Sequence, residues 1–378
     1  MGWDHIIGQQ RVKELLMRAL ERKQVAHAYL FYGEPGTGKT ALAIELARVL
    51  NCQTGGPTAC GSCPSCRKVD TLQHPNIKLI VPLPVGKSEK TGDDPVGVLT
   101  QEQVASLQQE LALKAKDPYH EIRLTKANFI KVNSVRQIRR EASMAGFESG
   151  MKVFIISNAD QMNTEASNSL LKTLEEPPAD TVLILTTARK EQLLPTIISR
   201  CQLVRCEPLT VQQIASALVE RDGIDKGEAM IAAQLANGSF TAARELVSED
   251  MARRKSEVVR FLRTALSNSP VTLSAEIEGI LASTERPDAE RWLRLLQVWF
   301  HDALALKTQH DRQSVHGGSD DDLQRFVERF GNGDLLGASE AVERSIALAG
   351  KNVYLPLIFT TLALDLRRLL STQSHYQQ

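Results

Sequence analysis

The sequence predicts a parallel α/β domain followed by a region built entirely of helices. Three short apolar runs, at residues 29–32, 152–157 and 182–186, are rich in β-branched or aromatic residues and are typical of buried strands. Helical segments separate these runs, and strands that alternate with helices form a parallel sheet covered by helices. After Pro208 the apolar residues recur only at helical spacing. We therefore expect a three-layer α/β domain that ends near residue 208.

Length and composition bound the class of protein. A chain of 378 residues is too long for one ordinary core, so two or three domains are expected. Its 42% hydrophobic and 24% charged residues are typical of soluble globular proteins, and 45 basic residues balance 45 acidic ones. The net charge is therefore zero and gives no indication of a nucleic-acid or membrane partner. The first four residues lack the basic start of a signal peptide, and no apolar run approaches the roughly 20 residues of a membrane helix, so we expect a cytoplasmic location and no membrane partner.

The strongest motif directly follows the first predicted strand. Gly33, Gly38, Lys39 and Thr40 match the phosphate-binding pattern G-x-x-x-x-G-K-[ST], and a predicted helix over 41–50 follows. The glycines let backbone N–H groups turn inward around a polyphosphate, and the helix N-terminus adds partial positive charge. Lys39 is expected to reach the β- and γ-phosphates and Thr40 a Mg²⁺ ion. The pattern predicts a site for ATP or ADP, with a glycine-rich turn that holds no ligand as the alternative. The residues concerned are Gly33, Pro35, Gly36, Gly38, Lys39 and Thr40.

Four cysteines follow the phosphate-loop helix within a short stretch. Their spacing is C-x7-C-x2-C-x2-C, and they are Cys52, Cys60, Cys63 and Cys66. Thiolates bridged by two-residue turns suit a tetrahedral Zn²⁺ ion, and four protein ligands leave no open position, so we predict a structural zinc module over 52–66. An iron–sulfur cluster and a redox dithiol are the alternatives. Cys201 and Cys206 are distant in sequence and are expected to be small core residues.

The stretch after the cysteines is less regular. Residues 74–81 end in a strand-like run, and 82–128 follow as a predicted insertion outside the core, with a helix over 101–116. A further predicted helix over 134–142 carries three arginines, Arg136, Arg139 and Arg140. Such a cluster is typical of a solvated helix face, and contact with a phosphate backbone is the alternative.

The strand over 152–157 lacks the acidic pair that an ATPase of this type requires. One carboxylate is needed beside Mg²⁺ and a second to polarise the attacking water, but Ser157 and Asn158 occupy these positions. Neither side chain is a general base near neutral pH, and Asn158 brings no negative charge to a metal. Asp160 lies two residues further on. We therefore expect nucleotide binding with poor hydrolysis.

Four features together resemble the clamp-loader subunits of the bacterial DNA polymerase III holoenzyme, which are members of the AAA+ family. They are the phosphate loop at 33–40, the cysteine module inserted after it, the run Leu-Leu-Lys-Thr-Leu-Glu-Glu-Pro-Pro at 170–178, and Ser199-Arg200-Cys201. The resemblance covers residues 1 to about 245. It implies an AAA+ nucleotide-binding domain over 1–208, a small helical lid over 209–250 and a helical collar for oligomerisation over 251–378. It also implies that Ile-Ile-Gly-Gln at 6–9 forms part of an adenine pocket.

The same resemblance implies roles and partners. Arg200 would be an arginine finger in the ATP site of the neighbouring subunit, where its planar fork can bridge two phosphate oxygens. Thr187, or its neighbour Thr186, would sense the γ-phosphate from the end of a strand. The implied partners are gamma/tau-type and delta-type clamp-loader subunits, with the sliding clamp and primed DNA reached through the complex.

Departures from the family pattern select among its subunits. The motor subunits, gamma and tau, carry Asp-Glu at the positions of Ser157 and Asn158, and an arginine at the position of Thr241 in the lid. Arg244 lies one helical turn later. Two losses on the ATPase side, with Arg200 retained, fit the delta-prime type. That type is a stator, which lends its finger to a neighbour and has weak or absent ATPase activity of its own.

Two other classes of function are alternatives. An active AAA+ ATPase, either a motor subunit or another DNA-remodelling enzyme such as a branch-migration helicase, would use Asp160 as its metal-side carboxylate. A P-loop kinase that acts on a small molecule would need an acceptor pocket, for which the sequence offers no candidate. The kinase hypothesis also leaves the helical C-terminal third without a role.

Overall fold

The chain divides into two compact units. The computed structural model describes residues 2–84, 90, 92–144, 148–247, 250–267, 269–282, 286–308, 321–349 and 353–371. The first unit comprises residues 1–214 and 237–242, and the second comprises residues 215–236 and 243–378. Within the predicted insertion, residues 85–89 and 91 lie outside the described residues.

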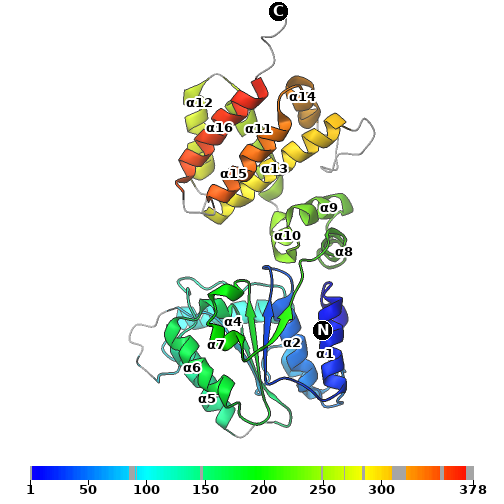
Figure 1. Ribbon diagram of the computed structural model, residues 1–378, viewed down its shortest axis with the longest axis vertical. Helices are drawn as coiled ribbons and strands as arrows, with labels where there is room; N and C mark the ends of the chain where they lie inside the picture. The colour runs from blue at the N-terminus through cyan, green and yellow to red at the C-terminus, as the bar shows by residue number, and fades with distance from the viewer. Residues whose placement is uncertain are drawn as a thin grey trace, which may run out of the picture. The chain divides into compact units, whose positions relative to one another are not determined.

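A five-stranded parallel sheet forms the centre of the first unit (Figure 1). Its strands are β1 (Ala28–Tyr32), β2 (Ile77–Ile80), β3 (Lys152–Ile156), β4 (Thr181–Thr187) and β5 (Gln202–Arg205). The order across the sheet is β2-β3-β4-β1-β5, so β1 pairs with β4 on one side and β5 on the other. The predicted parallel α/β class is confirmed. Only Val204 of the four β5 residues is buried, which is why no apolar run marks this strand in the sequence.

Helices cover both faces of this sheet, because alternate strand residues point to opposite faces. Leu30, Phe154 and Leu185 share one buried cluster with side chains of α5 and α6, and Figure 1 shows α1 and α2 on the other side of the sheet. The predicted three layers are therefore confirmed. The helices are α1 (Gln10–Glu21), α2 (Lys39–Leu50), α3 (Pro64–Asp70), α4 (Gln101–Lys116), α5 (Val132–Ser143), α6 (Thr164–Glu175) and α7 (Pro195–Ile198), with 3-10 turns at Trp3–His5, Ala159–Gln161 and Lys190–Gln192.

After Pro208 every regular element among the described residues is a helix, as predicted. These helices are α8 (Val211–Asp222), α9 (Lys226–Leu235), α10 (Phe240–Leu246), α11 (Asp250–Ala265), α12 (Pro270–Leu281), α13 (Arg286–Thr308), α14 (Asp321–Phe330), α15 (Leu335–Ala349) and α16 (Leu355–Ser371).

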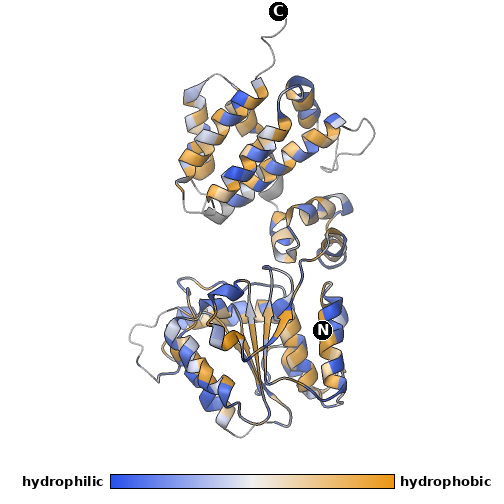
Figure 2. Ribbon diagram, viewed as in Figure 1, coloured by the Kyte–Doolittle hydropathy of each residue, from blue (hydrophilic) through white to orange (hydrophobic). Residues whose placement is uncertain are grey.

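Aromatic rings form part of the core of the second unit. The ring of Trp292 lies 5.1 Å from that of Phe261 and 5.2 Å from that of Phe359. Figure 2 shows the helices of this unit with mixed apolar and polar colouring, as expected for helices that bury one face. In the part of the chain that the structure describes, no helix is both long and apolar enough to cross a membrane.

Candidate functional site

The phosphate loop turns from the end of β1 into the start of α2, as the sequence predicts. The loop glycines with positive φ are Gly33 (149°), Gly36 (71°) and Gly38 (91°). A Cβ at Gly36 would lie 2.1 Å from Ser239 Oγ and 2.4 Å from Thr241 Oγ1. Only glycine therefore allows the segment 237–242 to approach the loop this closely. The backbone N–H of Phe240 also donates to the carbonyl oxygen of Gly36 at 3.1 Å.

Lys39 begins α2, and its amine points back onto the loop. Its Nζ donates to the carbonyl oxygens of Gly33 at 2.8 Å and of Glu34 at 2.6 Å. Burial lowers the pKa of Lys39, and nearby groups that include Cys206 and Glu121 oppose that shift. A partly desolvated amine at the start of a helix favours anionic phosphate groups at this loop.

The carboxyl ends of β3 and β4 bring five polar side chains close to the loop. The N–H of Asn158 donates to Thr186 Oγ1 at 3.3 Å, and the hydroxyl of Thr187 donates to Asp160 Oδ1 at 2.6 Å. Ser157, Asn158, Asp160 and Thr186 line the same pocket. Thr187 is fully buried and is not among the described residues that line the pocket, so it contacts the pocket through Asp160.

The loop and the strand ends enclose one pocket of about 490 Å³. The predicted phosphate-loop residues on its surface are Pro35, Gly36, Gly38, Lys39 and Thr40. Gly33 is not among the lining residues, but its carbonyl oxygen accepts a hydrogen bond from Lys39, which is. The structure therefore brings five of the predicted nucleotide-binding residues together on the pocket surface, while Gly33 and Thr187 only contact residues that line it.

One wall of this pocket comes from the insertion over 82–128. Lys114, Tyr119, Glu121 and Arg123 all line the pocket, and Tyr119 is only 4% exposed. The prediction that the insertion lies outside the core is therefore wrong for its C-terminal part. The chain has only 5 tyrosines, and one that directly follows Asp-Pro in a polar stretch is the signal that could have marked this segment.

The segment that the resemblance assigns to the lid contributes a hydroxyl rather than an arginine. Thr241 lines the pocket, and its Oγ1 lies 3.5 Å from a carboxylate oxygen of Glu121. Arg244, one turn later, forms a two-point ion pair with Asp222 through Nε at 3.0 Å and Nη2 at 2.9 Å. The guanidinium of Arg244 is thus already committed to a carboxylate.

The four predicted metal ligands converge. The sulfur atoms of Cys52, Cys60, Cys63 and Cys66 all lie within 4.8 Å of one another, and those of Cys60 and Cys66 are 4.0 Å apart. A tetrahedral ion with metal–sulfur bonds of about 2.3 Å needs sulfur atoms about 3.8 Å apart, so the cluster can hold one metal ion. Hydrogen bonds from backbone N–H groups lower the pKa of Cys60 to about 5, whereas burial raises the pKa of Cys66 to about 12. Cys60 therefore favours the thiolate that metals bind, and metal binding would have to displace the proton of Cys66.

A buried arginine connects this cluster to the phosphate-loop helix. Arg48, near the C-terminal end of α2, is almost fully buried and lies 3.6 Å from Glu45 and 3.3 Å from Asp70. Its side chain also hydrogen-bonds the sulfur of Cys66. Partners of this kind orient ligands in metal sites. The cysteine spacing does not indicate Arg48, because its contacts depend on how α2 packs against α3.

Arg200 lies apart from the phosphate-loop pocket, since it is not among the described residues that line it. Its Nη1 donates to the carbonyl oxygen of Thr196 at 3.0 Å, and its Nη2 lies 2.9 Å from a carboxylate oxygen of Glu175. Glu175 ends α6, directly before the Glu-Pro-Pro sequence. The side chain of Arg200 keeps 35% of its surface exposed. Cys201 and Cys206 are buried, as predicted for core residues.

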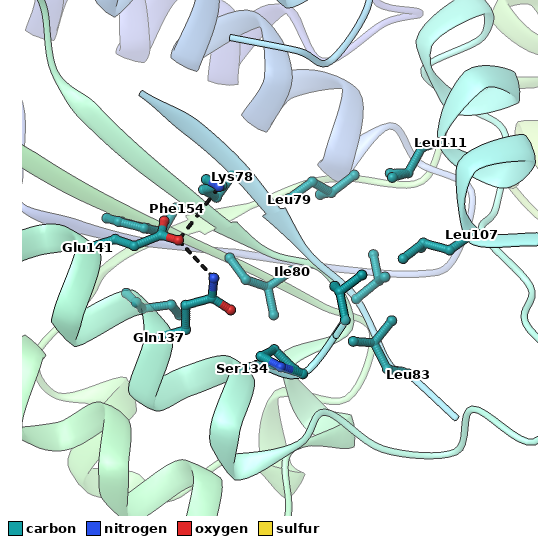
Figure 3. A pocket seen from close by; sticks show the side chains of 14 residues that line it. Lys78, Leu79, Ile80, Leu83, Leu107, Leu111, Ser134, Gln137, Glu141 and Phe154 are labelled. Atoms are coloured by element: carbon teal, nitrogen blue, oxygen red, sulfur yellow. Dashed lines mark hydrogen bonds and ion pairs between the residues drawn. The ribbon is translucent and has the colours of Figure 1, made fainter. Parts of the chain in front are cut away.

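A second, smaller cavity of about 170 Å³ lies beside the edge strand β2 (Figure 3). Leu79, Leu83 and Leu107 line its apolar part. At its rim, Glu141 accepts from Gln137 at 2.8 Å and lies 3.6 Å from Lys78 Nζ. This cavity differs chemically from the phosphate-loop pocket, because most of the side chains that line it are hydrocarbon.

Comparison with known proteins gives consistent matches. A family model described as DNA polymerase III, delta subunit, matches residues 8–210, just over half of the chain. DNA polymerase III subunit delta′ of Bacillus subtilis is 33% identical over 253 residues, which cover 67% of this chain and 64% of the relative, slightly less than two thirds of its length. The delta′ subunit of Pseudomonas aeruginosa is 30% identical over 325 residues, which cover 82% of this chain and 80% of the relative.

A tau subunit from one of the same organisms is also similar. DNA polymerase III subunit tau of Bacillus subtilis is 27% identical over 253 residues, which cover 65% of this chain and 37% of the relative. Over the same aligned length, this chain therefore has greater identity to the Bacillus subtilis delta′ subunit than to the tau subunit.

Proposed function

This chain belongs to the DNA polymerase III delta-subunit family, and from that membership we propose that it is a stator subunit of a cytoplasmic clamp loader. It binds ATP or ADP with Mg²⁺ without useful turnover, and it supplies Arg200 to the ATP site of a gamma/tau-type neighbour. A delta-type subunit completes the complex, which loads the sliding clamp on primed DNA. The AAA+ domain spans residues 1–208, the lid 209–250 and the collar 251–378 in this proposal.

The observation that carries the proposal is the chemistry of the pocket at the end of β3. Ser157 and Asn158 line it beside Lys39 and Thr40, where hydrolysis needs one carboxylate for the metal and another for the attacking water. An amide and a hydroxyl hold a nucleotide by hydrogen bonds but do not take a proton from water near neutral pH. Binding and turnover are thus separable in this site.

The residues for nucleotide binding fit the ligand. Gly36, Gly38, Lys39 and Thr40 line the pocket where the phosphate loop enters α2. Loop N–H groups and the N-terminus of α2 would bind phosphate, Lys39 would add a cation, and the Thr40 hydroxyl would bind Mg²⁺. Bound Mg²⁺ would screen the negative charge of the phosphates. Asp160 lines the pocket at the strand ends and accepts a hydrogen bond from the Thr187 hydroxyl at 2.6 Å, so it would be the carboxylate available to the metal there.

The placement of Arg200 supports a role in trans. The Thr196 carbonyl contacts Nη1 and Glu175 contacts Nη2 of the guanidinium, and 35% of the side-chain surface stays accessible. An arginine finger has to present a charged planar fork to a phosphoryl group outside its own subunit. Arg200 does not line the pocket of its own chain among the described residues, and in this proposal its guanidinium exchanges Glu175 for a phosphate of the neighbouring subunit.

The metal in the cysteine cluster is proposed to be a structural Zn²⁺. Four thiolates saturate a tetrahedral ion and leave no position for water or substrate. The ion would join the segment after α2 to α3, since Cys63 caps α3 and Cys66 lies within it.

An active ATPase is the second candidate, because Asp160 lines the pocket that holds Lys39. In that case Asp160 would hold Mg²⁺, and Asp160→Asn would abolish turnover. In the stator proposal, Asp160→Asn alters Mg²⁺-dependent nucleotide binding and does not change the rate of ATP hydrolysis, which is already negligible.

The deciding experiment measures two quantities on the isolated chain: equilibrium binding of a fluorescent ATP analogue, and steady-state phosphate release. We expect binding that Lys39→Ala removes, together with negligible release. Turnover near ~1 s⁻¹ that Lys39→Ala abolishes would contradict the stator proposal and favour the active ATPase. Co-elution with gamma/tau-type and delta-type subunits tests the assembly independently.

A further inference from the structure

Tyr119 of the insertion is packed among three distant segments at one end of the phosphate-loop pocket. Its hydroxyl oxygen accepts a hydrogen bond from the backbone N–H of Ile7 at 2.8 Å, across 112 residues of sequence. A Cβ at Gly38 would lie 2.9 Å from the same oxygen, so the phenol rests directly on the loop. Its ring meets Phe240 edge-on, with centroids 5.1 Å apart and an interplanar angle of 76°.

These contacts match what a nucleotide base requires from a protein. A base is a flat aromatic ring that needs an apolar neighbour for its face or edge and a backbone N–H for an acceptor atom on its rim. The phenol of Tyr119 provides such a ring and such an acceptor, and it lies against Gly38 of the loop that is proposed to bind phosphate. The pocket contains no other described aromatic ring on its lining.

The turn that carries Tyr119 is held mainly by its own neighbourhood. Lys114 Nζ donates to the carbonyl oxygens of Pro118 and His120, both at 2.7 Å, and the Asp117 carboxylate accepts from the N–H of Tyr119 at 3.0 Å. The side chain of His120 pairs with Glu110 at 2.9 Å. These bonds anchor the turn to α4 rather than to the phosphate loop, so the phenol can leave the loop while the turn persists.

We propose that the ring of Tyr119 occupies the place of a nucleotide base, so that a purine nucleoside di- or triphosphate must displace it to bind. The inference rests on the proposed nucleotide binding at the phosphate loop. Displacement exposes the Ile7 N–H to the incoming base and frees the surface of Gly38 and Phe240. The Tyr119 side chain is then docked on the phosphate loop in the nucleotide-free state and released from it in the bound state, while the turn stays attached to α4.

Displacement has a measurable cost in affinity. If the ring is docked in about nine-tenths of unliganded molecules, the apparent dissociation constant is raised about tenfold over that of the open site. Tyr119→Ala should therefore bind a fluorescent ATP analogue about tenfold more tightly than the wild type. Tyr119→Phe keeps the ring but loses the oxygen that accepts from Ile7, and should bind about two- to fivefold more tightly.

The test titrates the wild type, Tyr119→Ala and Tyr119→Phe with the fluorescent ATP analogue. Tyr354→Ala is the matched control, because Tyr354 is 70% exposed in the second unit. Hydrogen exchange of residues 114–124 is followed with and without ATP, and exchange should rise on binding in the wild type. Melting temperatures of the variants show whether the fold persists, and Tyr119→Phe keeps the test informative if Tyr119→Ala unfolds.

Equal or weaker binding by both Tyr119 variants, or protection of 114–124 by ATP, would overturn the inference. Tyr119 would then be a residue on which the base stacks, and the proposed nucleotide binding would not be contradicted. If the wild type, Tyr119→Ala and Tyr119→Phe all fail to bind any nucleotide, the proposed nucleotide binding fails, and the inference fails with it because opening the site created no affinity.

Discussion

The hydroxyl of Thr187 donates a 2.6 Å hydrogen bond to Oδ1 of Asp160 and joins the end of β4 to the turn after β3. Thr187 is fully buried, and the backbone N–H of Arg189 donates to the same hydroxyl at 2.9 Å. The donor direction of Thr187 is therefore fixed toward the carboxylate. Asp160 is held at the pocket by a residue that the resemblance names as a phosphate sensor.

Replacing Thr187 with valine should destabilise the first unit by about 1–2 kcal/mol. The substitution removes a charge-assisted hydrogen bond and leaves Oδ1 of Asp160 without the donor hydroxyl. Thr186→Val is the matched control, because Thr186 is equally buried but only accepts a longer bond from Asn158. Urea unfolding measures both variants. A larger loss for Thr186→Val would contradict the importance given to the Asp160 contact.

Arg200→Ala should leave nucleotide binding by the isolated chain unchanged, because Arg200 does not line its own pocket among the described residues. In the assembled complex, hydrolysis at the neighbouring site should fall by about a thousandfold. Single-turnover measurements on complexes with one competent site provide the readout. Arg200→Lys retains charge but not the planar fork, so restoration of the full rate by lysine would argue against phosphate bridging.

The purified chain should contain one zinc ion, and Cys60→Ser should lose it. Cys201→Ser serves as the control, because Cys201 is a buried thiol remote from the four-cysteine cluster in sequence. Elemental analysis measures the metal. Chelation should speed hydrogen exchange near residues 50–70 and leave the C-terminal helices unchanged. A chain purified without added metal that holds neither zinc nor iron would refute the structural-metal assignment.

Glu45 should make stability depend on pH near the cysteine cluster. Burial raises the pKa of Glu45 from 4.5 to about 7, and the guanidinium of Arg48 opposes that rise. The folded state therefore holds this proton more tightly than the unfolded state. The stability that Glu45 contributes is complete below about pH 4.5 and is lost as the pH rises through about 7.

Glu45→Gln should remove this loss, because the amide is neutral at every pH. Relative to the wild type, the variant should gain about 2 kcal/mol in unfolding free energy between pH 5 and pH 7.5. Urea unfolding at the two pH values measures the difference. Glu14→Gln, at an exposed carboxylate, is the control. Parallel pH profiles for Glu45→Gln and the wild type would show that Glu45 titrates normally.

Local patterns in the sequence were sufficient to predict the parts of the fold and site that depend on neighbours along the chain. The phosphate loop is one continuous turn, the four cysteines lie within one short segment, and the buried strands β1, β3 and β4 are apolar runs. Each could be predicted because its geometry is set within a few residues. The absence of an acidic pair at Ser157 and Asn158 is likewise a local property.

Features that depend on long-range packing could not be predicted in this way. Tyr119 reaches Ile7 only because α4 returns the chain to the phosphate loop, and Arg48 meets Cys66 only because α3 packs near the end of α2. The partner of Arg200, Glu175, belongs to a motif that the sequence identifies, but their pairing requires the contact between α6 and α7. Edge strand β5 is solvated and lacks the apolar pattern of its neighbours.

The order of the strands has a consequence for synthesis of the chain. β1 is the first strand to leave the ribosome, yet its partners β4 and β5 begin only at residues 181 and 202. At about 5–20 residues per second, the apolar segment Ala28–Tyr32 remains without its first neighbour for ~7–30 s. An unpaired apolar strand can pair with other nascent chains during that time. The hazard of aggregation for this domain is therefore set by translation speed, and slower translation between β1 and β4 lengthens the exposure.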